Sequence, residues 1–221
     1  MFSQVGVGNS ELQKEHGIRF SKIMGHGGFG GFSIWPNLKR YSFLIVWESK
    51  SKAESFFKSS MYFKQWKERS KDWFTFVLRP IKSHGKWSGK NPFEAGEEDD
   101  NLPIAVLTRA RIRWQKLWVF WRNVPSVYRQ MKRFPGLLFA NGIGEYPIFQ
   151  QATISIWENK AAMMEFAYKD ERHARIVQRT RSENWYGEEL FGRFNVVGYF
   201  SNHRGDFDRL CSKFSATDFP T

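Results

Sequence analysis

The chain has 221 residues, of which 41% are hydrophobic and 18% aromatic, and its formal net charge is +12. This composition allows a buried core, and the single cysteine, Cys211, excludes an internal disulfide or a cysteine-built zinc or iron–sulfur centre within one chain. Met1–Ser10 lacks the pattern of a signal peptide, and the longest apolar runs are too short to cross a bilayer. We therefore expect a cytoplasmic protein. Its basic surface either attracts an anionic partner, which includes the inner face of a membrane, or serves solubility.

Residues 1–81 are expected to form the first, incomplete module of the chain. Phe43–Trp47 predicts a strand, and a basic helix with Lys64, Lys67, Arg69 and Lys71 follows. Met1–Ser10 is too short and too rich in glycine to supply an opening strand and helix. His26 falls in a glycine-rich run at 25–31, which we expect to be a mobile loop. The run lacks the Lys-Ser/Thr of a phosphate loop.

A connector at residues 82–101 is predicted from its Gly, Ser, Lys and acidic residues. Residues 102–221 form the second module, and Pro125 is expected to kink or interrupt its first helix. The expected elements are, in order, a strand at Pro103–Trp114, a helix at Gln115–Lys132, strands at Leu137–Ile143 and Phe149–Trp157, a helix at Asn159–Arg181 and a strand at Phe194–Phe200. This β-α-β-β-α-β order is ferredoxin-like.

Sparse matches between the two halves keep their order along the chain and indicate a duplicated module. The matched segments are Gly17, Phe20 and Gly25 with Gly136, Phe139 and Gly144; Trp47-Glu48, Lys50 and Phe56 with Trp157-Glu158, Lys160 and Phe166; and Ser70 and Trp73-Phe74 with Ser182 and Trp185-Tyr186. We expect an α+β fold in which a fused pair of ferredoxin-like modules forms a dimeric α+β barrel. Two facing four-stranded sheets would leave pockets between sheet and helices.

His173 is the histidine that the pattern places on an apolar helical face. It lies seven residues after Phe166 and four before Val177, with Met163 close by. A core histidine explains this placement, and so does an axial ligand of haem iron, since a neutral imidazole in an apolar pocket suits that role. Asp170 could cap a new helix and reset the phase.

Two charged segments allow a structural and a functional interpretation. Glu188-Glu189 is expected on a solvated face or paired with Arg193. The alternating run Arg109–Trp114 fits a nucleic-acid groove, but a strand with one solvated face is the favoured interpretation. An RNA-recognition module shares the ferredoxin-like order, yet no strand here carries its aromatic signature, so nucleic acid is the less favoured partner.

An ordered set of segments resembles the spheroidene monooxygenase family, the acyclic carotenoid 2-ketolases. The resemblance extends from about Gly17 to Gly205. Its segments are Trp87-Ser88-Gly89-Lys90-Asn91-Pro92-Phe93, Leu107-Thr108-Arg109-Ala110, Phe120-Trp121-Arg122-Asn123-Val124-Pro125, Gly142-Ile143-Gly144-Glu145-Tyr146-Pro147, Gln151-Ala152-Thr153-Ile154-Ser155-Ile156-Trp157 and Trp185-Tyr186-Gly187-Glu188-Glu189-Leu190-Phe191.

The resemblance implies a haem-dependent monooxygenase that uses molecular oxygen to oxidise C2 of an acyclic, spheroidene-like carotenoid to a hydroxyl or a ketone. It favours His173 as the catalytic iron ligand, with Met163, Phe166 and Val177 beside the haem and Met163 and Met164 as alternative ligands. Aromatic residues would line the carotenoid tunnel; the candidates are Trp118, Trp121, Phe149, Trp35 and Phe120.

A reduced ferredoxin, or a similar acidic electron donor, is the partner that the resemblance implies. The basic helix with Lys64, Lys67, Arg69 and Lys71 is expected to dock this donor or an anionic membrane face, although a solvated helix face explains it equally. Similar sequences have a longer N-terminus that would complete the first module. The alternatives to an enzyme are a haem or lipid carrier and an RNA-binding module.

Overall fold

The structure, a computed structural model, describes residues 10–28, 33–146, 148–169 and 171–202, and for residues 169 and 171–174 it describes the backbone alone. The chain divides into two compact units. The first comprises Met1–Ile23, Phe43–Val77 and Val197–Thr221, and the second comprises Met24–Ser42 and Leu78–Val196. No helix in the described ranges is long and apolar enough to span a membrane.

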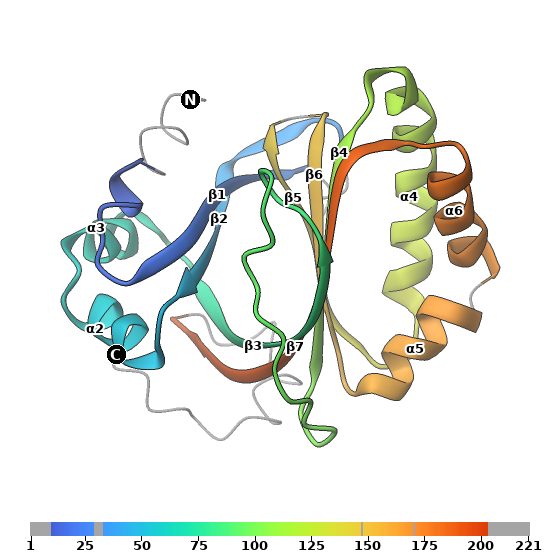
Figure 1. The fold of residues 1–221 in the computed structure, drawn as a ribbon. Coiled ribbons are helices and arrows are strands. Elements are labelled where there is room, and N and C mark those ends of the chain that lie inside the picture. Colours follow the sequence, from blue (N-terminus) through green and yellow to red (C-terminus); the bar gives the residue numbers. More distant parts are fainter. Residues whose placement is uncertain (1–9, 29–32, 147, 170, 203–221) are drawn as a thin grey trace. The chain divides into compact units, whose positions relative to one another are not determined.

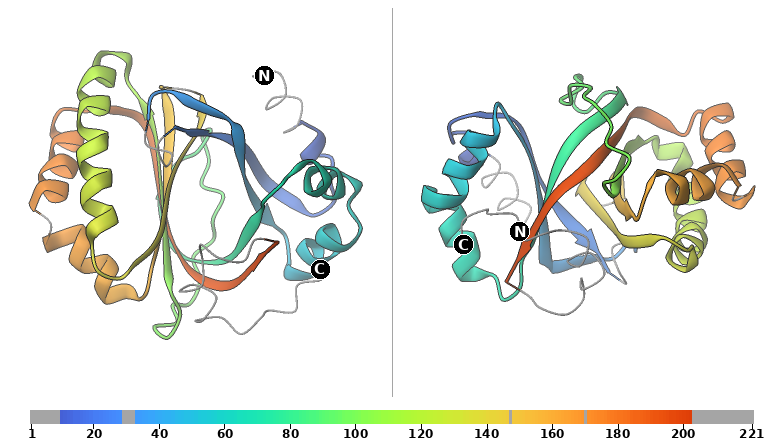
Figure 2. Two further views of the ribbon diagram at one scale, coloured as in Figure 1. Left: turned by 180° about the vertical axis from the view of Figure 1, so that it is seen from behind. Right: turned by 90° about the horizontal axis from the view of Figure 1, so that it is seen from below.

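The second half of the chain contains the ferredoxin-like elements that the sequence predicted. They are β4 (Ile104–Ile112), the short 3-10 helix η1 (Trp114–Lys116), α4 (Leu117–Arg133), β5 (Leu137–Tyr146), β6 (Gln150–Trp157), α5 (Lys160–Lys169), α6 (Glu171–Ser182) and β7 (Tyr186–Ser201). The strands lie in the order β5-β6-β4-β7, and their pairs are antiparallel. Helices α4, α5 and α6 cover one face of these strands (Figure 2).

Two helix predictions need correction. α4 runs through Pro125 without interruption, and the Asn123 side chain donates to the Val119 carbonyl oxygen at 2.7 Å just before the proline. The prediction of one helix over Asn159–Arg181 is wrong, because two helices, α5 and α6, form there. The helical phase therefore does not carry over from Phe166 to His173. The cap expected at Asp170 lies outside the described residues.

The first half of the chain follows the later part of the same order. Its elements are β1 (Ile18–Gly27), β2 (Pro36–Trp47), α2 (Lys50–Ser59), α3 (Met61–Arg69) and β3 (Phe74–Gly85), the same succession as β5-β6-α5-α6-β7 (Figure 1). Ser49 and Ser60 cap α2 and α3, because their hydroxyls accept from the Lys52 and Phe63 amides. Lys71 lies beyond the end of α3, not on the helix as expected.

The strands are joined in one hydrogen-bonded sheet of order β2-β1-β5-β6-β4-β7-β3, where the sequence predicted two facing sheets. Phe43–Trp47 and Ile154–Trp157 were expected to be equivalent central strands. This prediction is wrong for Phe43–Trp47, because β2, which contains it, is the edge strand at one end of the sheet. β6 pairs with β4, the opening strand of its module. The described part of the first half has no such strand, so β2 lacks that neighbour.

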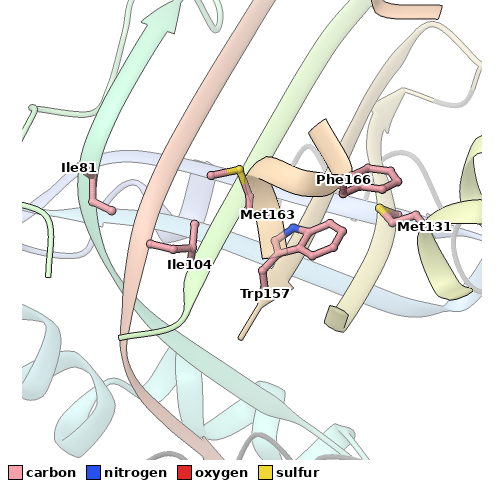
Figure 3. Packing of buried hydrophobic residues seen from close by; sticks show 6 residues of the cluster. All are labelled: Ile81, Ile104, Met131, Trp157, Met163 and Phe166. Carbon is pink, nitrogen blue, oxygen red and sulfur yellow. The ribbon is translucent and has the colours of Figure 1, made fainter. Parts of the chain in front are cut away.

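The helix side of the second unit is a packed apolar core. Trp157 is 1% exposed, and its ring stacks on Phe166 with the centroids 5.0 Å apart. Figure 3 shows Trp157 beside Met163 and Phe166 of α5 and Met131 of α4. Val106 of β4 and Ala140 of β5 pack against the same cluster, which identifies the sheet face that the helices cover.

The segment between β3 and β4 runs along the opposite side of these strands (Figure 1). Its Trp87 and Phe93 are buried, and the side-chain amide of Asn195 donates to the Asp99 carbonyl oxygen at 2.8 Å. Glu98 accepts a hydrogen bond from Lys160 at 2.8 Å. This expected connector is therefore held against the sheet over much of its length.

Candidate functional site

A buried arginine lies at the centre of the face that the helices leave uncovered. Arg109 pairs with Ala152 of β6 and Leu190 of β7, and its side chain is 2% exposed. Side chains alternate along a strand, so Arg109 points away from the face on which Val106 meets the helices. The prediction that Arg109 lies on a solvated face is therefore wrong.

Two carboxylates and an amide surround the Arg109 guanidinium. It forms an ion pair with Glu188, approaches Glu145 at 3.4 Å and donates to the Gln150 side-chain oxygen at 3.0 Å. Glu188 was expected to face solvent or to pair with Arg193. This prediction is wrong, because Glu188 pairs with Arg109. A buried cation is tolerated when it is paired and hydrogen-bonded in this way.

The same network fixes the turn after β3. The Trp87 indole donates to Glu145 at 2.7 Å, and the Arg109 guanidinium carbon lies 5.5 Å from the Trp87 ring centroid. The backbone amides of Ser88 and Gly89, both with positive φ, donate to the Glu188 carboxylate at 3.1 and 2.9 Å. Burial acts to raise the pKa of Glu188, but the bonds from Gly89, Ser88 and Arg109 outweigh it and lower this pKa.

A second polar group lies on the same sheet face. His26 of β1 is 8% exposed; its Nε2 lies 2.7 Å from the Ser42 hydroxyl, and the Asn141 side-chain amide donates to its Nδ1 at 2.9 Å. Burial, followed by the positive charge of Arg40, lowers the pKa of His26 to about 4. The expectation of a mobile loop is wrong for His26, which is an ordered strand residue with a neutral ring at neutral pH.

The register of the sheet connects the two groups. His26 pairs with Ile143, Ile143 with Ala152 and Ala152 with Arg109, and residues paired across a sheet point to the same face. The sheet face opposite the helices therefore carries a row of four paired residues, in which the polar His26 and Arg109 stand at the ends and the apolar Ile143 and Ala152 lie between them. Sequence reasoning missed this arrangement, although Trp87, Arg109, Glu145 and Glu188 come from four segments on which the family resemblance rests.

The structure describes the side chains of some, but not all, of the residues predicted to surround a haem. Met163 and Phe166 are each 6% exposed and belong to the packed core around Trp157. Val177 is half-buried on α6. His173 belongs to α6 by its backbone, while its side chain lies outside the description. Met164 is 37% exposed. No cluster of potential metal ligands occurs within the described residues.

The predicted tunnel aromatics lie mostly at the surface. Trp118 is 79% exposed, Trp35 is 74% exposed and Phe149 is 46% exposed. Phe120 and Trp121 are half-buried, and the Trp121 indole donates to the Ile148 carbonyl oxygen at 3.2 Å. Within the described residues, Trp118, Trp121 and Phe149 gather at one end of the second unit, where α4 begins and β5 turns into β6.

Comparison with known proteins places this ferredoxin-like chain among the monooxygenases. It is 32% identical over 216 residues to spheroidene monooxygenase of Rhodobacter capsulatus, covering 96% of this chain and 89% of that protein. It is 35% identical over 189 residues to spheroidene monooxygenase of Cereibacter sphaeroides, covering 85% of this chain and 58% of that protein. The chain belongs to the spheroidene monooxygenase family and is an oxidoreductase, as the ordered segments predicted.

No protein-family model matches the chain. A solved structure of a monooxygenase-like protein from Fusobacterium nucleatum is similar over 91% of this chain and 86% of that one, with 8% identity and a TM-score of 0.44. A likeness at this level supports no conclusion about activity.

Proposed function

We propose that the protein is a monooxygenase that oxidises C2 of an acyclic carotenoid to a hydroxyl or a ketone. The observation that carries this proposal is the 32% identity to spheroidene monooxygenase over 96% of the chain. In the first step the C2–H bond breaks and a C2–O bond forms. The second oxygen atom of dioxygen leaves as water and takes up two electrons and two protons. A second such step, with another dioxygen, two electrons and two protons, places a second hydroxyl on C2, and loss of water from this geminal diol leaves the ketone.

Haem is the cofactor we propose, with His173 as its protein ligand. Met163 does not fit this role, because it is 6% exposed within a core that Trp157, Phe166 and Met131 fill. An imidazole is a common protein ligand of haem iron. His173 stands at the start of α6, one of the three helices that cover this sheet face. Haem would supply the oxygen and one-electron chemistry that side chains lack.

The chain's own residues have the tasks of binding, orientation and exclusion of water. The sheet face that carries the His26 and Arg109 groups is apolar and buried at Ile143 and Ala152. Aromatic surfaces suit a rigid polyene, and we propose Trp118, Trp121 and Phe149 as substrate contacts. The ion pairs of Arg109 position the Trp87 turn, so Arg109 acts through other residues and is not assigned a chemical role.

Electrons must reach the site from a donor, for which we propose a reduced ferredoxin or a similarly acidic protein. Lys64 and Arg69 of α3 are exposed, and Lys71 follows just after the helix. The Lys67 ammonium lies 5.1 Å from the centroid of Trp73, so its charge is held against the surface. Such charges steer an acidic partner through a field that salt screens.

The His173→Ala variant tests the haem proposal, with His84→Ala as the matched control. His84 is an exposed histidine of the same unit that stacks on Phe191. After purification from haem-supplied cells, His173→Ala should lose the haem Soret band and oxygenation while its circular dichroism stays native. His84→Ala should keep all three. A normal Soret band in His173→Ala would show that the iron ligand is another residue.

A further inference from the structure

A group of exposed aromatic side chains stands at the end of the second unit where α4 begins. We call Trp114, Trp118, Tyr146 and Phe149 the aromatic rim. Their exposures are 74%, 79%, 59% and 46%. Large aromatic side chains are normally buried, and several exposed together mark a surface that binds a partner.

Backbone and side-chain hydrogen bonds hold the two parts of the rim together. The Ile112 amide donates to the Phe149 carbonyl oxygen at 2.8 Å, and the Trp121 indole donates to the Ile148 carbonyl oxygen at 3.2 Å. Figure 1 shows the start of α4 at the same end of the unit as the turn between β5 and β6. Trp114, Trp118 and Tyr146 therefore belong to η1, α4 and β5, and Phe149 directly precedes β6.

The charges around the rim are positive. Residues 111–122 and 146–150 contain no Asp or Glu. Arg111, Arg113 and Arg122 are exposed, while Lys116 bonds to Glu183 at 3.4 Å. Glu183 also accepts from Arg179 at 2.8 Å. The surface thus combines exposed indole rings with the exposed guanidinium groups of Arg111, Arg113 and Arg122.

Exposed aromatic rings together with positive charge favour binding to the surface of an anionic bilayer. Trp and Tyr prefer the boundary between hydrocarbon and headgroups, because their rings are apolar at one end and polar at the other. Each nearby Arg or Lys adds to the attraction toward an anionic leaflet. We infer that the aromatic rim docks the protein peripherally on a membrane that contains anionic lipid.

Docking here would bring the proposed substrate contacts Trp118 and Phe149 to the bilayer that dissolves the carotenoid. Only this reason for docking rests on the proposed function, in which the substrate is a carotenoid and Trp118 and Phe149 contact it. Membrane binding itself requires neither haem nor turnover. Its failure and the failure of the proposed oxygenation are therefore measured separately.

The test is co-sedimentation of the full chain with lipid vesicles. The vesicles contain phosphatidylcholine alone or phosphatidylcholine with phosphatidylglycerol. Wild type should bind the anionic vesicles, and added salt should weaken this binding. The double variant Trp114→Ser/Trp118→Ser should bind at least about tenfold more weakly, because each indole loses its contact with the lipid. Trp35→Ser is the matched control, since Trp35 is 74% exposed outside the rim, and it should bind as wild type does.

Two further readouts keep the inference falsifiable. Arg113→Gln/Arg122→Gln should lose the preference for anionic vesicles while its circular dichroism stays native. If oxygenation is active, the single variant Trp114→Ser, which leaves the proposed substrate contacts intact, should be slow with carotenoid in vesicles and normal with carotenoid in detergent. Equal vesicle binding by wild type and the double variant would overturn the inference. So would a dimer of wild type that the double variant abolishes, or docking of an acidic protein at the rim without vesicle binding.

Discussion

The two faces of the strands β5-β6-β4-β7 are built on different principles. The helix face is apolar, with Trp157, Phe166 and Met163 in one packed core. The other face buries charge: Arg109 is held there by Glu145 and Glu188. Hydrophobic burial stabilises the first face, while the second depends on the pairing of Arg109 with its carboxylates. Mutations should therefore act through lost packing on one face and through unpaired charge on the other.

Phe166→Ala should show the largest effect, on the helix face. Phe166 is 6% exposed and packs against Trp157 and Phe134, so its removal leaves a cavity. We expect the free energy of unfolding to fall by about 4 kcal/mol in urea titration. Tyr168→Ala on the same helix is the control, since Tyr168 is 73% exposed and its loss should change stability by less than about 0.5 kcal/mol. Equal effects of the two variants would refute the packed core.

Arg109→Leu should break the opposite face. It keeps apolar volume but leaves Glu145 and Glu188 without their cation, and we expect a loss of about 3 kcal/mol in the same titration. This is the lower end of the usual range, because the two carboxylates are still 13% and 16% exposed. Adding Glu145→Gln and Glu188→Gln should recover part of the loss. Arg111→Ala, at an exposed position two residues along β4, should be nearly neutral. No recovery in the triple variant would contradict the charge explanation.

His26 should make the stability of this face depend on pH. Its pKa is about 4 in the folded chain and 6.5 unfolded, so the unfolded chain binds more protons between these values. The contribution of His26 is complete above pH 6.5 and is lost as the pH falls toward 4, on the order of 3 kcal/mol in all. His26→Gln should flatten the stability profile in this window, and the exposed His84→Gln should leave it unchanged. A profile of His26→Gln as steep as that of wild type would remove His26 as its source.

Trp87→Phe should have the smallest effect. It keeps the buried ring under Arg109 but removes the indole N–H that donates to Glu145 at 2.7 Å. We expect a loss of about 1–2 kcal/mol, the cost of leaving one acceptor less satisfied. Hydrogen exchange should show faster opening of the Ser88 and Gly89 amides. Unchanged exchange would mean that the indole does not help to fix the turn.

The helix face could be predicted from the sequence, and the opposite face could not. Apolar periodicity gave the β-α-β-β-α-β order and placed Met163 and Phe166 on one buried helical face. It failed over Asn159–Arg181, where α5 and α6 replace one helix, because periodicity alone does not locate the boundary between two consecutive helices. It also could not show that Arg109 is buried, because an alternating strand looks the same whether its polar face meets water or a carboxylate.

The candidate site was hidden because its members are distant in the chain. Trp87, Arg109, Glu145 and Glu188 meet only when three strands and the turn after β3 are assembled. The motif segments contained each of them, but spacing along the chain carried no sign that they converge. The roles of His173, Met163, Phe166 and Val177 at a haem, and of Trp118, Trp121 and Phe149 at a carotenoid, stay predictions.

Turnover with isotopically labelled dioxygen tests the central claim most directly. The protein, loaded with haem and supplied with a reduced ferredoxin, would be incubated with an acyclic carotenoid, and the product would be analysed by mass spectrometry. The account predicts a product with one labelled oxygen at C2, formed by wild type and His84→Ala and absent with His173→Ala. A carotenoid that returns unchanged from haem-loaded, correctly folded wild type, or that gains its oxygen from water, would contradict the account.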